Sequence, residues 1–142
     1  MVRSEALSAL STSLEISLAP SSEAPALARS ALHAAYADSM PAVVLQDLKV
    51  IVTELVTNSW RYAPEGPIRL LIEPRGKLEL EGAVEDGGHE PFGMVEIRDD
   101  GGLGLHIVDA LAWRWEVAER GGAVRFTLQA DSRLSRRAEA VQ

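Results

Sequence analysis

A carboxylate and an amide stand four residues apart, at Glu54 and Asn58, in a stretch that otherwise has the spacing of an apolar helix. Side chains four residues apart on an α-helix lie one turn from each other, so both groups share one face. Polar groups in an apolar helix cost stability unless they are solvated, paired or used for a ligand. A half-exposed polar face is the commoner explanation of such a pair, so ligand binding needs support from elsewhere in the chain.

The helix that carries this pair is expected from about Ala42 to Tyr62. One stripe along it can pack on a core and comprises Leu45, Leu48, Ile51, Val52, Leu55, Val56 and Ser59. A neighbouring polar stripe comprises Asp47, Glu54, Asn58 and Arg61. The helix is therefore expected to bury one side and to present a polar flank next to it.

The bulk composition limits the classes of protein to consider. The 142 residues suit a single domain, and the net charge of −7 argues against a nucleic-acid binder without excluding a nucleotide ligand. There is no cysteine, so no disulfide framework or zinc–thiolate site is expected, which fits a reducing interior. Residues 1–20 show no secretory leader, and no apolar run could span a membrane. We expect a cytoplasmic protein that does not insert into membranes.

The remaining elements are predicted from periodicity and turn residues. We expect a loose leader at 1–8, a domain at 9–130 and a flexible tail at 131–142. Within the domain the predicted order is strand 11–18, helix 24–37, helix 42–62, strands 68–73 and 77–86, a glycine-rich loop at 87–102, helix 103–112, and strands 113–119 and 123–129. Gly82, inside the third strand, is compatible with a bulge. This order predicts an α+β fold, a two-layer α/β sandwich with a mixed, mostly antiparallel sheet and helices on one face.

Two further motifs accompany the Glu54/Asn58 pair. Asp86-Gly87-Gly88 ends a predicted strand, and Gly101-Gly102-Leu103-Gly104-Leu105 opens a predicted helix. Each alone is more often an ordinary turn or connection, but the three in this order are specific. Together they resemble the GHKL family of ATP-binding domains (the Bergerat-like fold), and within it the bacterial anti-sigma-factor serine/threonine kinases. The resemblance covers about residues 10–130.

The resemblance implies a role for each motif. Asn58 would bind Mg²⁺ through its amide oxygen, a hard ligand that suits this ion, and Glu54 would be the catalytic base that accepts a proton from the attacking hydroxyl. Asp86 would accept a hydrogen bond from the exocyclic amine of adenine. The implied nucleotide-binding residues are Asn58, Arg61, Asp86, Gly88, Gly102, Leu103, Gly104, Leu105 and Thr127. The implied cofactors are ATP and Mg²⁺.

The resemblance also implies partners and leaves an alternative open. A kinase of this type phosphorylates an anti-anti-sigma protein of the STAS type, binds a sigma factor to regulate transcription, and is often a homodimer. The segment between the glycine motifs is short and carries Glu96, Asp99 and Asp100, whose charges would repel phosphate. The alternative is therefore a catalytically weak or inactive nucleotide-binding module that regulates by binding partners. A fragment of a sensor kinase is disfavoured because no helix with a phosphoacceptor histidine is evident.

Other residues favour ordinary structural roles. His33 and His106 lie on predicted helices with no second ligand at metal spacing, and His89 beside Glu90 is a weak zinc candidate. The three tryptophans, Trp60, Trp113 and Trp115, are interpreted as packing residues rather than as a platform for stacking bases, because the chain is acidic.

Overall fold

The computed structural model describes residues 12–62, 65–75, 79–87, 105–118 and 122–129. These residues form five strands and three helices: β1 (Leu14–Leu18), α2 (Ala24–Tyr36), α3 (Ala42–Tyr62), β2 (Ile68–Pro74), β3 (Glu79–Glu85), α5 (Leu105–Leu111), β4 (Arg114–Val117) and β5 (Ala123–Gln129). The predicted leader and tail, at 1–8 and 131–142, lie outside the described residues. Every predicted helix and strand of the domain has a counterpart in the described part of the chain.

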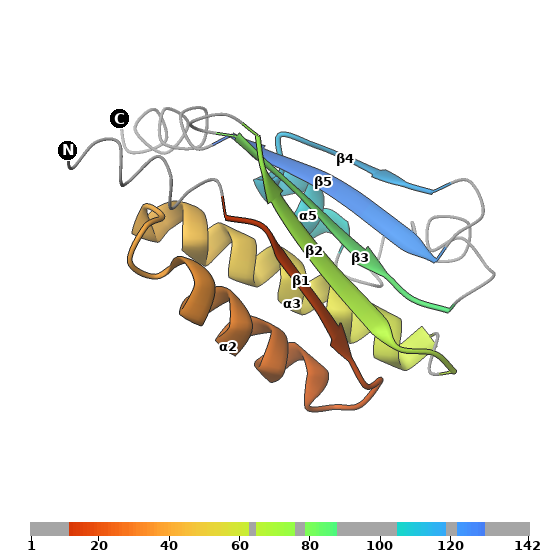
Figure 1. Cartoon of the computed structure of the whole chain (residues 1–142). Helices are drawn as coiled ribbons and strands as arrows, with labels where there is room; N and C mark the ends of the chain where they lie inside the picture. The colour runs from red at the N-terminus through yellow and green to blue at the C-terminus, as the bar shows by residue number, and fades with distance from the viewer. Residues whose placement is uncertain (1–11, 63–64, 76–78, 88–104, 119–121, 130–142) are drawn as a thin grey trace.

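The strands form one sheet in the order β1-β2-β3-β5-β4. All pairings between these described strands are antiparallel, so the sheet is not mixed as the sequence suggested. The three helices lie side by side over one face, with α3 between α2 and α5 (Figure 1). This is the predicted α+β two-layer sandwich.

Alternation along the strands explains why the sheet has one covered face. In β2, Ile68, Leu70 and Ile72 are buried while Arg69 and Glu73 are exposed. The buried set meets the apolar stripe of α3, whose Leu48, Val52 and Leu55 are at most 1% exposed. Burial of each such aliphatic side chain contributes about 1.5–3 kcal/mol. We call the covered side the inner face of the sheet and the opposite side its outer face.

Gly82 lies on the inner face of the sheet, opposite the large side chain of Phe126. The pairing of β3 with β5 continues through Gly82, which lies opposite Phe126, so the suggested bulge is wrong. A Cβ atom built on Gly82 would clash with Cζ of the Phe126 ring. Glycine at this position leaves room for the Phe126 ring, which is 2% exposed and part of the core.

The position of α3 between its neighbours decides what its polar flank faces. On one side, Lys49 Nζ lies 3.0 Å from His33 Nδ1 of α2, and Arg29 of α2 donates to Thr53 Oγ1 at 3.1 Å. On its other side α3 packs against α5.

Among the residues described, no helix is long and apolar enough to cross a membrane.

Candidate functional site

The polar flank of α3 is turned away from α2. Asn58 follows Lys49 by nine residues, which is two and a half turns, so the two side chains leave the helix on opposite sides. Because Lys49 contacts α2, Asn58 faces the side on which α5 packs. Asp47 lies three turns before Asn58 on the same flank, and both are buried, at 2% and 4% exposed. Asp47 and Asn58, two members of the flank, are thus enclosed by protein.

Glu54 belongs to the same flank but lies closer to the solvent. Its side chain is half-buried, unlike that of Asn58 one turn later. It also borders a shallow depression of about 230 Å³ over α2 and α3, together with Arg29, Gln46, Lys49, Val50 and Thr53. A carboxylate in this position can be approached from outside while its neighbour Asn58 stays enclosed.

Asp86 comes to the carboxyl-terminal end of α3 through backbone contacts. Its N–H donates to the carbonyl oxygen of Gly122 at 2.7 Å, which fixes the end of β3 beside the start of β5. Gly66, in the turn after α3, packs against the backbone of Gly87, and an added Cβ on Gly66 would lie 3.4 Å from the Cα of Gly87. The Asp86 side chain is half-buried, with its Oδ2 atom shielded from solvent. The Asp86-Gly87 pair therefore lies beside the turn that follows α3.

The second glycine motif and part of the first lie outside the described residues. This applies to Gly88, Gly102, Leu103 and Gly104. Leu105 is the first residue of α5, the helix that packs against α3.

Arg61 lies on the last turn of α3 and is exposed. Its guanidinium carbon is 5.9 Å from the centroid of the Trp60 ring, at the outer limit for a cation–π contact. It follows Asn58 by three residues, so it continues the polar flank toward solvent.

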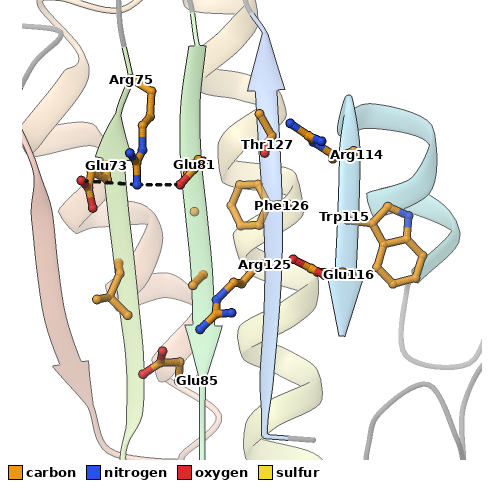
Figure 2. A pocket seen from close by; sticks show the side chains of 13 residues that line it. Glu73, Arg75, Glu81, Glu85, Arg114, Trp115, Glu116, Arg125, Phe126 and Thr127 are labelled. Carbon is orange, nitrogen blue, oxygen red and sulfur yellow. Dashed lines mark ion pairs between the residues drawn. The ribbon is translucent and has the colours of Figure 1, made fainter. Parts of the chain in front are cut away.

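Thr127, the remaining predicted nucleotide-binding residue, does not lie with these residues. It alternates with Phe126 and Leu128, which are in the core, and shares the outer face of β5 with exposed Arg125. There it borders a hollow of about 530 Å³ together with Arg114, Glu81 and Glu73 (Figure 2). Thr127 and Asn58 are thus on opposite faces of the sheet.

That hollow is larger than the depression beside Glu54, yet the hollow and the polar flank of α3 are separate. The charged side chains that line the hollow partly neutralise one another, because Arg75 pairs with Glu81 at 3.1 Å and with Glu73 at 3.7 Å (Figure 2). We place the candidate site at the flank, where polar groups are enclosed and where all the described motif residues except Thr127 gather.

Trp60 and Trp115 pack against the core as predicted, whereas Trp113 is 41% exposed. No group of three metal-binding side chains occurs within the described ranges. Trp115 donates through Nε1 to Asp109 Oδ1 at 2.9 Å, and the guanidinium of Arg114 lies 4.5 Å from the ring centroid of Trp113. His89 lies outside the described residues.

Sequence reasoning placed Ser59 in the apolar stripe and gave it no role. The structure shows it fully enclosed next to Asn58, with its Oγ buried and without a hydrogen-bond partner. The signal in the sequence was a hydroxyl at a core position of the helix directly beside a motif residue.

Comparison with known proteins identifies the family of the chain. The family model of the histidine kinase-like ATPase domain matches residues 18–128, and the chain belongs to this family. The family predicted from the three motifs is thereby confirmed.

Among solved structures, the chain is similar to the crystal structure of the RsbU and RsbW domains of Rv1364c from Mycobacterium tuberculosis, with a TM-score of 0.62 and 19% identity. The match covers 82% of this chain and 31% of that one, so the chain spans just under a third of the length of that protein. At this identity the likeness shows the fold. Comparison with proteins of curated function gave no match.

Proposed function

We propose that this chain is a cytoplasmic protein serine/threonine kinase of the anti-sigma-factor type that uses ATP and Mg²⁺. The observation that carries the proposal is the enclosed amide of Asn58, 4% exposed and one turn from the half-buried carboxylate of Glu54. Polar groups are retained inside an apolar helix when they are paired within the protein or serve a ligand. Membership of an ATPase family favours a nucleotide ligand at this site.

The enclosed groups fit a bound nucleotide. The side-chain oxygen of Asn58 would hold Mg²⁺, which accepts one or two protein ligands and keeps several waters. Asp86 would accept the exocyclic amine of adenine, since the Gly66–Gly87 contact holds it at the same end of α3 as Asn58. The backbone N–H groups around Gly88, Gly102, Leu103, Gly104 and Leu105 would face the base and the phosphates, with Arg61 at the exposed end.

Glu54 would act as the base. A partner serine that enters from the depression over α2 and α3 meets a carboxylate open to solvent on that side. Glu54 would accept the hydroxyl proton while the serine oxygen takes the γ-phosphoryl group of ATP and ADP leaves. Bound Mg²⁺ supplies charge neutralisation on the phosphates. Beyond this base, the protein would mainly position the reactants and stabilise the charge on the phosphates.

The partners in this proposal come from the resemblance of the motifs. The acceptor would be a serine of a small anti-anti-sigma protein of the STAS type, and the second partner a sigma factor, so that the chain regulates transcription in a bacterium. Both partners would compete for one surface, with the nucleotide state biasing the outcome.

The first test is thermal unfolding with and without nucleotide. ATP with Mg²⁺ at about 100 times its dissociation constant should stabilise the fold by about 2.7 kcal/mol. Asn58→Ala should lose the Mg²⁺-dependent part of this stabilisation. Thr127→Val is the matched control, because it removes a hydroxyl from the outer face and should leave binding unchanged. No stabilisation of the natural chain at millimolar ATP would overturn the proposal.

The second candidate function is nucleotide-dependent partner binding without catalysis. Glu96, Asp99 and Asp100, between the two glycine motifs, favour it because they weaken the attraction for phosphate. Incubation with a STAS-type protein and ATP separates the two functions. Phosphoserine on that protein supports the kinase, whereas ATP binding and complex formation without phosphoserine support the regulatory module.

A further inference from the structure

The hollow on the outer face of the sheet is lined by a polar side chain without a partner. Thr127 is 7% exposed, and its hydroxyl makes no hydrogen bond within the described part of the chain. Unlike the Oγ atom of Ser59, the hydroxyl oxygen of Thr127 is not sealed off, so it is reached from the hollow that the residue lines. Polar atoms on nearly buried side chains are almost always paired, so this hydroxyl points to a ligand in the hollow.

Two arginines beside Thr127 lack acidic partners. Arg114 lies directly across from Thr127 on β4, and Arg125 lies two positions along β5 on the same face (Figure 2). No carboxylate among the residues described pairs with either guanidinium, whereas Arg69 and Arg75 on this face each pair with two glutamates. In a chain with a net charge of −7, two adjacent cations without acidic partners favour a negatively charged ligand.

The acidic side chains of the hollow do not cancel these two charges. Of the four described glutamates that line the hollow, three are paired with arginines other than Arg114 and Arg125, namely Glu73, Glu81 and Glu85. Glu116 is the fourth, and it forms no ion pair with the described residues. The unpaired groups of the hollow therefore have one positive charge in excess.

An apolar patch adjoins the arginines. Leu71 pairs with Ala83, and Ala83 pairs with Arg125, so these side chains form a row across β2, β3 and β5 on the outer face. Leu71 and Ala83 are half-buried and line the hollow. Its volume of about 530 Å³ is within the range of roughly 300–1,000 Å³ that is usual for small-molecule sites. The hollow thus offers a cationic end and an apolar floor to one small ligand.

We propose that the outer hollow is a second binding site, separate from the nucleotide site on α3, for a small organic carboxylate with an apolar tail. The carboxylate accepts hydrogen bonds from the guanidinium groups of Arg114 and Arg125 and from the hydroxyl of Thr127. The tail lies on Leu71 and Ala83. A guanidinium group matches a planar carboxylate with two parallel N–H···O bonds. This inference goes beyond the proposed function and does not depend on it.

Hexanoate is the probe, titrated without nucleotide into the isotope-labelled full chain and followed by the NMR shifts of the backbone amides. We expect saturable shifts at millimolar hexanoate in the strands that line the hollow and none in α3. Acetate lacks the apolar tail and should bind about 10-fold more weakly. Hexylammonium has the tail with the opposite charge, and it should not bind at the hollow.

Substitutions test the contacts to the carboxylate. Arg125→Ala should raise the dissociation constant of hexanoate about 10-fold, because a hydrogen bond between charged groups is lost. Thr127→Val removes the hydroxyl at nearly constant shape and should raise it roughly 3- to 10-fold. Arg29→Ala is the matched control, because it changes the net charge equally but lies on α2, where Arg29 donates to Thr53. It should leave the dissociation constant unchanged.

Three outcomes would overturn the inference. The first is that hexanoate gives no saturable shifts at the hollow, or that hexylammonium gives the same ones. The second is that Arg125→Ala and Arg29→Ala weaken binding equally, which would be an effect of overall charge. The third is a natural chain that sediments as a dimer while Arg125→Ala sediments as a monomer, because the hollow would then be an interface between copies. Each of these outcomes leaves the proposed nucleotide site untouched.

Discussion

The two faces of the sheet carry polar groups in opposite ways. On the outer face, Arg69 pairs with Glu15 and Glu85 at 2.7 and 3.0 Å, and Arg75 pairs with Glu73 and Glu81, all on side chains at least 30% exposed. On the helical side, α3 encloses Asp47, Asn58 and Ser59, each 4% exposed or less. The outer face is a charged surface in water, whereas the helical side holds polar groups inside a core.

The difference shows where function should be sought. Exposed ion pairs replace contacts with water by contacts with another charged side chain, so they contribute little to stability. Their presence does not indicate a functional site. Enclosed polar groups are retained where they are paired within the protein or serve a ligand. The outer hollow is larger, but the enclosed groups on α3 lie beside Glu54 on the motif helix, so α3 is the better candidate for the nucleotide site. Two pairs of substitutions and one single substitution test this comparison.

The largest difference is expected between two glutamates. Glu54→Ala should retain ATP binding and reduce phosphoryl transfer to the STAS-type partner about 10²- to 10⁴-fold, because the hydroxyl loses its base. Glu73→Ala, at the outer face, should transfer at the natural rate. Radiolabel transfer measures both. A Glu54→Ala chain as active as Glu73→Ala would show that Glu54 is not the base.

Packing on the inner face gives the second difference. Gly82→Ala should destabilise the fold by about 1–3 kcal/mol, because the new methyl would meet the Phe126 ring and force it to move. The adjacent Ala83→Ser changes the outer face, which is open there, and should stay within about 0.5 kcal/mol. Urea unfolding measures both. Equal effects would mean that the ring is not packed on Gly82.

The smallest effect is expected from the ion pairs. Arg75→Ala removes both pairs of a side chain that is 54% exposed, and should cost less than about 1 kcal/mol. Any loss should shrink in 1 M salt, where screening acts within about 3 Å. Unfolding curves at two salt concentrations measure it. A loss above 2 kcal/mol that persists in salt would contradict the view of these ion pairs as ordinary surface contacts.

Much of the fold could be predicted because its signals are local. The helical spacing from Leu45 to Ser59 and the branched apolar residues of 68–73 predicted the correct elements. The bulge suggested at Gly82 was wrong for a reason of packing, because Gly82 makes room for the Phe126 ring of β5. Thr127 was assigned by motif position, and its alternation with Phe126 and Leu128 places it on the outer face of the sheet.

The sequence by itself determined the periodicity of each element, the order of the three motifs and the family to which they belong. The tertiary structure decided that Asn58 faces α5 rather than α2, that the backbone of Gly87 reaches the turn at Gly66, and that the Ser59 hydroxyl is enclosed without a partner. The reason is physical. Covalent geometry fixes which side chains share a face, but contacts between residues distant in the chain fix what that face meets.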